Sequence, residues 1–218
     1  HLEARPLTLK RYPNGTEAGH FFEKNCPKHR PGWLTTVPVP SARRPIDYCV
    51  VDSVAGLVWV ANLASLELHP SLSRAPRVGQ PTTVVFDLDP GAPAALAECR
   101  EVALHLRDLF DHLGLATVVK TSGSKGLQVY LPLNTPATYD GPGGTKAFAL
   151  AVAQLLEREL PGLVVSSMAK ELRAGKVLVD WSQNDEHKTT VAVYSLRAKD
   201  RPTVSTPVTW DEVEAGGD

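Results

Sequence analysis

A pair of carboxylates at the end of an apolar strand is the clearest sign of chemistry in this sequence. Asp87 and Asp89 close the mostly apolar residues 83–89 and are followed by Pro90. Alternate residues of a strand face the same side, so these carboxylates point together and repel unless a cation lies between them. Carboxylate oxygens suit Mg²⁺ or Mn²⁺, and two such ions act together in phosphoryl chemistry. We therefore expect a catalytic metal site here; the alternative is a capping pair at a strand end.

A turn of small residues and a third carboxylate could complete such a site. Residues 121–126 read Thr-Ser-Gly-Ser-Lys-Gly, and small residues let backbone N–H groups approach a phosphate. The hydroxyls of this turn would add donors and Lys125 would add positive charge, although the spacing is not that of a P-loop. A plain hairpin turn is the alternative. Asp180 ends a further apolar strand, and it could join Asp87 and Asp89 if the two strands are neighbours.

The hydrophobic pattern predicts the elements that would position these residues. Apolar runs and alternating polarity indicate strands at residues 7–12, 48–51, 57–60, 65–69, 83–89, 116–120, 127–131, 177–181 and 190–194. Helical periodicity predicts helices over residues 93–113 and 145–160. Residues 52–56 are expected to form a hairpin-like connection, residues 70–81 a loop, and residues 25–46 short irregular pieces. Strands outnumber those of a usual doubly wound fold, so we predict a mixed α/β (α+β) architecture.

Length and composition are those of an ordinary globular domain. The chain has 218 residues, of which 43% are hydrophobic and 22% are charged. No window approaches 18 consecutive apolar residues, so we expect no membrane span. Cys26, Cys49 and Cys99 are odd in number and widely spaced. A disulfide framework is therefore not expected, and a reducing cytoplasm fits this cysteine usage better.

Charge is distributed unevenly along the chain, although the net charge is only -1. Residues 1–46 hold eight Lys and Arg against three acids, whereas residues 47–218 hold 15 against 21. A basic segment of this kind can face a phosphate backbone while the acidic remainder holds metal cations. Chance clustering of surface charges is the alternative.

Several short motifs follow one another in a characteristic order between residues 5 and 213. They are RPLTLKRYP at 5–13, HFFEK at 20–24, ELHP at 67–70, FDLDPG at 86–91, KTSGSKGL at 120–127, DWSQN at 180–184, YSLRA at 194–198 and VSTPVTW at 204–210. This order resembles the polymerase domain of bacterial ligase D and its stand-alone relatives, which belong to the archaeo-eukaryotic primase superfamily.

The resemblance implies a fold and an activity. The fold is a primase-like core, in which a mixed or antiparallel sheet with an RNA-recognition-like half is flanked by helices. The activity is templated addition of nucleotides, often ribonucleotides, to DNA 3′ ends, with two Mn²⁺ or Mg²⁺ ions and nucleoside triphosphates as substrates. Expected partners are gapped or broken DNA with a 5′-phosphate, the end-binding protein Ku, and nuclease and ligase modules. The setting would be bacterial non-homologous end joining at the cytoplasmic nucleoid.

The resemblance also implies boundaries for the domain. Residues 1–218 would form one catalytic domain, with residues 1–46 as its DNA-facing segment. Members of the family carry a helical segment before residue 5 and further chain after residue 213. The chain is therefore expected to be a trimmed or reduced form of the domain, especially at its N-terminus.

Roles follow from the resemblance residue by residue. The metal-binding triad corresponds to Asp87, Asp89 and Asp180. Positions that hold the incoming nucleotide correspond to Lys10, His69, Ser122, Ser124, Lys125, Arg173 and Arg197. Positions near the DNA correspond to the aromatic pair Phe21 and Phe22, a stacking platform for the template, and to Lys24, in a segment associated with the downstream 5′-phosphate.

The sequence departs from the family pattern at two places, and two other functions are possible for its motifs. Gln128 stands where many members have His, which alters one expected phosphate contact, and residues 185–187 are Asp-Glu-His where relatives often carry basic residues. A phosphohydrolase of the haloacid-dehalogenase type would use Asp87 as its nucleophile, but it usually follows its second Asp with Gly-Thr or Gly-Val and needs a series of βα units. A non-catalytic DNA-end-binding module would leave three acids without a metal, which only destabilises a fold.

Overall fold

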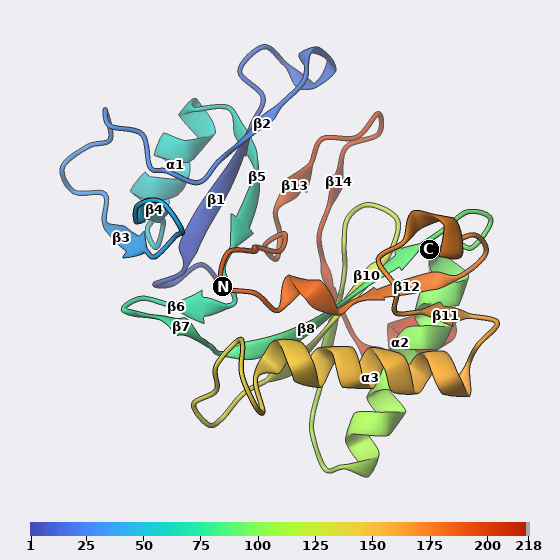
Figure 1. Ribbon diagram of the computed structural model, residues 1–218. Coiled ribbons are helices and arrows are strands. Elements are labelled where there is room, and N and C mark those ends of the chain that lie inside the picture. Colours follow the sequence, from blue (N-terminus) through green and yellow to red (C-terminus); the bar gives the residue numbers. More distant parts are fainter. Residues whose placement is uncertain (217–218) are drawn as a thin grey trace.

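The computed structural model describes residues 1–216, whose strands gather into two main sheets, each the centre of one lobe (Figure 1). The N-terminal lobe is antiparallel and contains β1 (Pro6–Arg11), β2 (Phe21–Glu23), β3 (Thr36–Val39), β4 (Ile46–Val50) and β5 (Ser65–Pro70). The central strand β1 pairs with β2, β4 and β5. Helix α1 (Val54–Asn62) joins β4 to β5, and its Val60 packs into the core with Leu7 and Leu9.

The C-terminal lobe carries the larger sheet. Its strands, in spatial order, are β11 (Val164–Val165), β12 (Val177–Asp180), β8 (Thr83–Pro90), β10 (Leu127–Pro132), β9 (Val118–Thr121) and β15 (Pro207–Val208). Within the described part of the chain, β11 and β12 are the one parallel pair of this sheet. Helices α2 (Leu96–His112) and α3 (Thr145–Glu159) pack on it, and the short helix α4 (Trp210–Ala215) packs on α2 (Figure 1).

Strand β8 shows how the sequence pattern builds this lobe. Val84, Phe86 and Leu88 alternate along the strand and are fully buried against α2 and α3. Their neighbours Asp87 and Asp89 must therefore lie on the opposite face, which these helices do not cover. The apolar alternation thus buries one face of the sheet and presents the carboxylates on the other.

Smaller elements complete the chain and lie between or beside the lobes. They are the strands β6 (Ser73–Arg74), β7 (Arg77–Pro81), β13 (Leu196–Arg197) and β14 (Thr203–Val204), with 3₁₀ turns at Thr16–Ala18, Lys170–Leu172 and Trp181–Gln183. The hairpin of β13 and β14 lies beside β5 of the N-terminal lobe (Figure 1). No helix within residues 1–216 is both long and apolar enough to cross a membrane.

The mixed architecture predicted from the sequence is confirmed, but some elements differ. Residues 57–60 belong to α1 and not to a strand, because the Ser53 hydroxyl accepts the Gly56 N–H at 3.1 Å and begins a helix where a hairpin was expected. Residues 190–194 form no strand; Thr190 and Ala192 donate backbone bonds to β5, and Tyr194 then turns with φ 63°. The predicted loop at 70–81 contains the β6–β7 hairpin, and the irregular region 25–46 contains β3.

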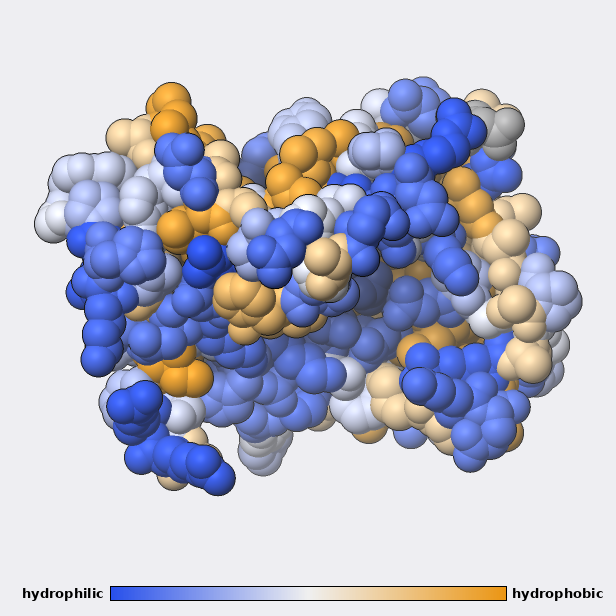
Figure 2. Space-filling view, turned by 90° about the horizontal axis from the view of Figure 1, so that it is seen from above, coloured by the Kyte–Doolittle hydropathy of each residue, from blue (hydrophilic) through white to orange (hydrophobic). Residues whose placement is uncertain are grey.

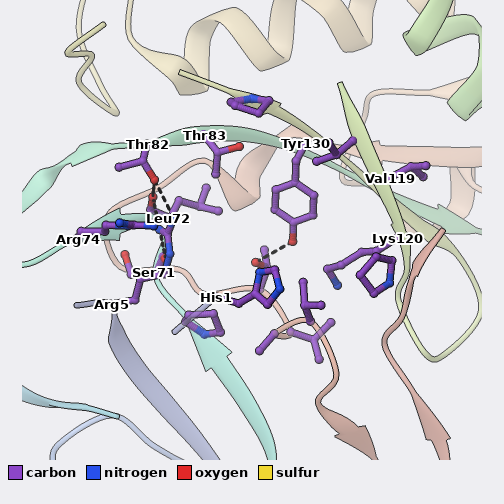
Figure 3. A pocket seen from close by; sticks show the side chains of 18 residues that line it. His1, Arg5, Ser71, Leu72, Arg74, Thr82, Thr83, Val119, Lys120 and Tyr130 are labelled. Atoms are coloured by element: carbon purple, nitrogen blue, oxygen red, sulfur yellow. Dashed lines mark hydrogen bonds between the residues drawn. The ribbon is translucent and has the colours of Figure 1, made fainter. Parts of the chain in front are cut away.

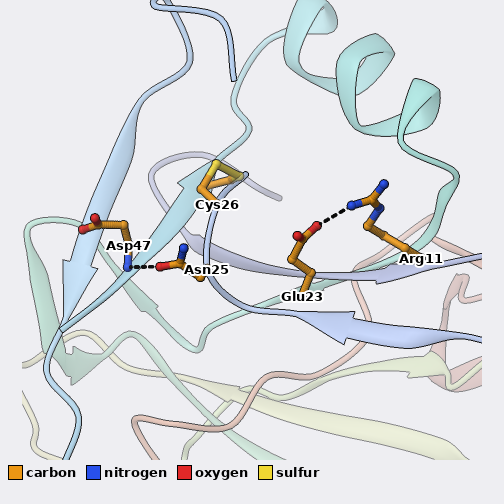
Figure 4. Close-up of a disulfide and its surroundings, with 6 residues drawn as sticks. Arg11, Glu23, Asn25, Cys26 and Asp47 are labelled. Carbon is orange, nitrogen blue, oxygen red and sulfur yellow. Dashed lines mark hydrogen bonds and ion pairs between the residues drawn. A yellow bond between two sulfur atoms is a disulfide. The ribbon is translucent and has the colours of Figure 1, made fainter. Parts of the chain in front are cut away.

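The expectation that the cysteines stay unpaired is wrong for two of them. Cys26 and Cys49 form a disulfide with their Cα atoms 5.0 Å apart, although they are 23 residues apart in the sequence (Figure 4). Sheet formation brings them together, because the Cys26 N–H donates to the carbonyl of Asp47 on β4 at 2.6 Å. Cys99 is free and buried under β8. The disulfide thus ties the loop after β2 to the sheet.

Replacing both Cys26 and Cys49 by alanine is expected to lower the free energy of unfolding by about 3 kcal/mol, since the bond closes a loop between residues 23 apart in the unfolded chain. In a chain of this size, that loss lowers the melting temperature by about 6–12 °C. Thermal unfolding with and without reductant checks this, because reductant should affect only the wild type. Titration of three free thiols in the denatured, unreduced protein would contradict the assignment.

Candidate active site

The register of three neighbouring strands brings the predicted carboxylates together. Asp180 on β12 lies directly opposite Asp87 on β8, and Asp87 lies opposite Gln128 on β10. Asp89 follows two residues after Asp87 and so faces the same side. The triad expected from the sequence thus shares one face of the sheet, across two adjacent antiparallel strands.

The three carboxylates on this face of the sheet are not fully balanced by nearby positive charge. Burial, and then the neighbouring carboxylate of Asp89, raise the pKa of Asp87 to about 7, and Asp180 adds to the effect. Burial and Asp180 also raise the pKa of Asp89. Burial lowers the pKa of nearby Lys120 to about 7, so this lysine compensates the acids only in part. The arrangement favours a bound cation, which would relieve the repulsion.

The donor set fits a hard divalent ion, because it consists of carboxylate oxygens. Asp180 is held in place by Ser182, whose backbone N–H and hydroxyl approach Oδ1 at 2.9 and 2.5 Å, and by Gln183, whose Nε2 lies 2.7 Å from Oδ2. Across residues 1–216, no three acidic, histidine or cysteine side chains already stand in a metal-ligating cluster. The inference that a divalent cation binds here therefore rests on two observations. Asp87, Asp89 and Asp180 share one face of the sheet, and their carboxylates repel one another.

The predicted phosphate turn, residues 121–126, lies against β8, the strand that carries Asp87 and Asp89. A Cβ atom on Gly126 would meet the carbonyl oxygen of Leu88, which lies between the two acids of β8, at 1.8 Å, so only glycine allows this approach. The Ser122 hydroxyl accepts the N–H groups of Ser124 and Gly126, both at 3.2 Å, and stabilises the turn. Ser124 and Lys125 are exposed at its tip. The turn is thus positioned beside the carboxylates, with Lys125 open to a ligand.

Glu67, to which the sequence analysis assigned no role, gathers three residues expected to hold the nucleotide. Its carboxylate lies 2.8 Å from Lys10 Nζ and 3.2 Å from both His69 Nε2 and Arg197 Nε. Arg197 also donates from Nη1 to the Ser122 carbonyl at 3.1 Å, so it joins this cluster to the phosphate turn. Glu67 alternates with His69 on one strand, and this spacing was the one available signal that they act together.

Arg173 and Gln128 border the acids from two sides. Arg173 donates from Nη2 to the Met168 carbonyl at 2.6 Å, and its charge lowers the pKa of Asp89 against the opposing effect of burial. Gln128 is buried and hydrogen-bonds Asp87. The Gln128 side chain therefore contacts an acid of the triad.

The residues expected to face DNA lie at the surface of the N-terminal lobe. Phe21 and Phe22 are 44% and 55% exposed on β2. The Phe22 ring meets the ring of His69 edge-on, with centroids 5.6 Å apart, so it adjoins the cluster of side chains around Glu67. Arg11 lies over the ring of Phe21 instead, 5.3 Å from its centroid. Lys24 reaches the other lobe and donates to the His187 carbonyl at 2.8 Å.

A cavity of about 550 Å³ lies beside the site, where the lobes meet. Figure 3 shows Lys120 and Tyr130 on one side of it and Arg5 near Leu72 on the other. The Tyr130 hydroxyl lies 2.9 Å from Gln128 Oε1, which links the cavity wall to the residue that contacts Asp87. Seen from above, the molecule is hollowed near its middle, where hydrophilic residues line the surface (Figure 2).

In metal-free protein at pH 8, Asp87→Asn is expected to raise the melting temperature by a few degrees, since ~1 kcal/mol corresponds to about 2–4 °C in a chain of this size. The change removes one of the repelling charges. At pH 5 the gain should be smaller, because wild-type Asp87, with its pKa raised to about 7, still holds its proton in the folded state. Thermal unfolding in chelator at both pH values checks this.

The control for this comparison is Asp47→Asn, which removes an exposed carboxylate of β4, outside the triad. It should change the melting temperature little at either pH. An equal gain for Asp87→Asn at pH 5 and pH 8 would show that charge repulsion is not the cause.

The chain is similar to known proteins over nearly its whole length. The sequence matches the family model of the LigD primase-polymerase domain over residues 1–218. It is 45% identical over 222 residues to the multifunctional non-homologous end joining DNA repair protein LigD of Mycobacterium tuberculosis. It is 30% identical over 215 residues to the bifunctional non-homologous end joining protein LigD of Bacillus subtilis. Both alignments cover 98% of this chain but only 29% and 34% of those relatives, about a third of their length.

A solved structure is similar over the whole chain. The polymerase domain from Mycobacterium tuberculosis ligase D, in complex with DNA, matches with a TM-score of 0.93 and 44% sequence identity. The match covers 100% of this chain and 78% of that one. Since the family model and these relatives align with nearly every residue, the resemblance seen in the sequence motifs is confirmed: the chain belongs to the LigD primase-polymerase domain family.

Proposed function

We propose that this chain adds nucleotides to DNA 3′ ends under the direction of a template, as part of bacterial non-homologous end joining. The observation that carries the proposal is the shared face of Asp87, Asp89 and Asp180, with the phosphate turn packed against the strand that bears two of them. Nucleotidyl transfer needs acids for cations at one point and donors for a triphosphate beside it. Membership of the LigD primase-polymerase family supports this reading.

Two Mn²⁺ or Mg²⁺ ions would supply activation of the attacking 3′-hydroxyl and neutralisation of the departing pyrophosphate. Asp87 and Asp89 are the residues that would hold both ions, and Asp180 would hold the one nearest the hydroxyl. The hydrogen bonds from Ser182 and Gln183 keep the Asp180 carboxylate oriented while it does so. The chain's own contribution is thus a fixed set of acids on a rigid sheet.

The triphosphate would be held by donors from both lobes. The expected donors are Lys10, His69, Ser122, Ser124, Lys125, Arg173 and Arg197. Since Ser122 already accepts two backbone N–H groups, its own hydroxyl hydrogen remains for a phosphate oxygen. With His69 Nε2 directed at Glu67, Nδ1 is the ring nitrogen that a phosphate would meet; since burial lowers the pKa of His69, Nδ1 would donate there only once the imidazole takes up a proton. Such preorganised donors stabilise the charge that develops on the leaving group.

DNA would lie across the N-terminal lobe. Phe21 and Phe22 are exposed aromatic rings suited to stacking on template bases, and Lys24 would lie toward a downstream 5′-phosphate. The basic residues 1–46 would provide the wider phosphate-facing surface. The similar polymerase domain in complex with DNA supports this proposal. Ku and the nuclease and ligase modules are the proposed partners at a broken end in the nucleoid.

The two alternatives account for less of the molecule. A phosphohydrolase of the haloacid-dehalogenase type needs parallel βα units, whereas β8 is antiparallel to both of its neighbours. A binding module without catalysis leaves the mutual repulsion of the carboxylates without a purpose. Templated nucleotidyl transfer uses both the acids and the turn.

Asp89→Ala is expected to abolish extension of a primed, gapped DNA with a 5′-phosphate in the presence of Mn²⁺, because the ions lose a shared ligand. DNA affinity should stay within about twofold. The checks are primer extension with ribo- and deoxynucleotides and a DNA-binding titration, with a phosphatase substrate as a parallel assay. Normal extension by the variant would refute the proposed role of the triad, and phosphatase turnover would favour the alternative enzyme.

Phe21→Ala and Phe22→Ala are expected to differ. Each should weaken binding to templated DNA about tenfold, since one stacked base contributes roughly 1–3 kcal/mol. Only Phe22→Ala should also raise the KM for the nucleotide, because Phe22 contacts His69 whereas Phe21 lies under Arg11. Separate titrations of DNA and nucleotide measure this, and equal effects of the two variants on nucleotide KM would contradict it.

A further inference from the structure

The most deeply buried acid of the N-terminal lobe has no role in the proposed chemistry. Glu67 lies on β5 and is 1% exposed, yet its carboxylate is ionised: burial alone would raise its pKa, but hydrogen bonds from His69, Lys10 and Tyr12 hold the pKa below its ordinary value. A buried carboxylate is costly unless it is paired and fully hydrogen-bonded. The residues that pair with Glu67 therefore indicate the role of this buried carboxylate.

Both carboxylate oxygens of Glu67 are in use. Oε1 accepts from Lys10 Nζ at 2.8 Å, from the Tyr12 hydroxyl at 2.7 Å and from the backbone N–H of Ala198 at 3.3 Å. Oε2 lies 3.2 Å from His69 Nε2 and 3.2 Å from Arg197 Nε. Hydrogen bonds from Lys10, Tyr12, Ala198 and His69 and the nearby charge of Arg197, whose Nε makes no hydrogen bond, surround the carboxylate, so little capacity is left for a metal ion or a substrate group. Any role of Glu67 must therefore act through its partners.

Three of these partners come from separate parts of the chain. Lys10 is on β1, His69 on β5 and Arg197 on β13, and all three are mostly buried. Two permanent cations so close together would repel each other and turn apart without an acid between them. The acid holds them beside His69, and one excess positive charge remains while His69 is neutral, the form that burial favours by lowering the pKa of His69.

The cluster also adjoins the other parts of the proposed site. Arg197 donates to the Ser122 carbonyl of the phosphate turn at 3.1 Å. The Phe22 ring contacts His69, and Lys10 Nζ lies 5.6 Å from the centre of the same ring. The cluster around Glu67 thus contacts both the phosphate turn and the aromatic ring of Phe22.

We propose that Glu67 is the positioning residue of the nucleotide pocket: it orients Lys10, His69 and Arg197 toward the triphosphate of the incoming nucleotide. This inference rests on the proposed function. It assigns Glu67 no contact with substrate. Its effect is on nucleotide affinity, not on the metal-dependent step or on DNA binding.

The test is Glu67→Gln, which keeps the shape of the side chain and removes its charge. The dissociation constant of a non-hydrolysable nucleoside triphosphate, measured by titrating the nucleotide in the presence of Mn²⁺, should rise about tenfold or more, by analogy with the loss of an outer partner of a metal-ligating side chain. In primer extension, KM for the nucleotide should rise more than kcat falls, and DNA affinity should stay within twofold. The matched control is Glu157→Gln, a part-buried acid of α3 that accepts from Ser166, and it should change neither constant.

Two further variants keep the inference testable if Glu67→Gln folds poorly. Tyr12→Phe removes one hydrogen bond to Oε1 without a change of charge, and it should raise the nucleotide dissociation constant by a smaller factor. In a His69→Ala background, Glu67→Gln should cost less nucleotide affinity than it does in the wild type, because one residue through which it acts is gone. Additive losses in that cycle would overturn the inference, since a general structural role would give them.

The outcomes separate this inference from the proposed function. If the wild-type chain binds no triphosphate, the proposed function fails and the inference fails with it. If the wild type binds the triphosphate and Glu67→Gln or Tyr12→Phe binds it equally well, only the role of Glu67 is refuted. A loss of kcat without a change in KM would also overturn it.

Discussion

The repulsion among Asp87, Asp89 and Asp180 is the interaction around which the other charged groups of the site are arranged. The antiparallel register of β8 and β12 sets two of the acids opposite each other, and the alternation of β8 adds the third to the same face. Burial and mutual repulsion then raise the pKa of Asp87 to about 7. A rigid sheet cannot move these carboxylates apart, so the relief must come from cations and from the arginines and lysine around them.

One of the positive groups near the acids, Arg197, lies on a segment that joins the lobes. Residues 195–205 run from β5 to β9: the Ser195 hydroxyl accepts the Leu68 N–H at 2.9 Å, and the Ser205 hydroxyl donates to the Thr121 carbonyl at 2.7 Å. Arg197 lies on this segment and pairs with Glu67 in one lobe while it donates to Ser122 in the other. The same contacts that hold the lobes together therefore also orient the cationic side of the site.

Local patterns predicted the elements well where burial followed a simple period. The run at residues 83–89 became β8, and the periodic residues 93–113 contain α2, because each has one face against the core. The pattern was misleading at residues 57–60, where an apolar run with both valines and a tryptophan suits a strand, but the Ser53 cap starts a helix. It was also misleading at Cys26 and Cys49, since a pairing over 23 residues depends on which strands become neighbours.

The types of the catalytic candidates were readable from the sequence alone, because Asp-x-Asp after an apolar strand, the small-residue turn and the exposed Phe pair are local signals. Their convergence was not. Asp180 reaches Asp87 through strand register, and Gly126 reaches Leu88 through a close backbone approach. Glu67 gathers residues from three strands. Such contacts join positions far apart in the chain, and a sequence carries no local period for them. The tertiary structure alone decided that the buried Glu67 lies at the centre of Lys10, His69 and Arg197.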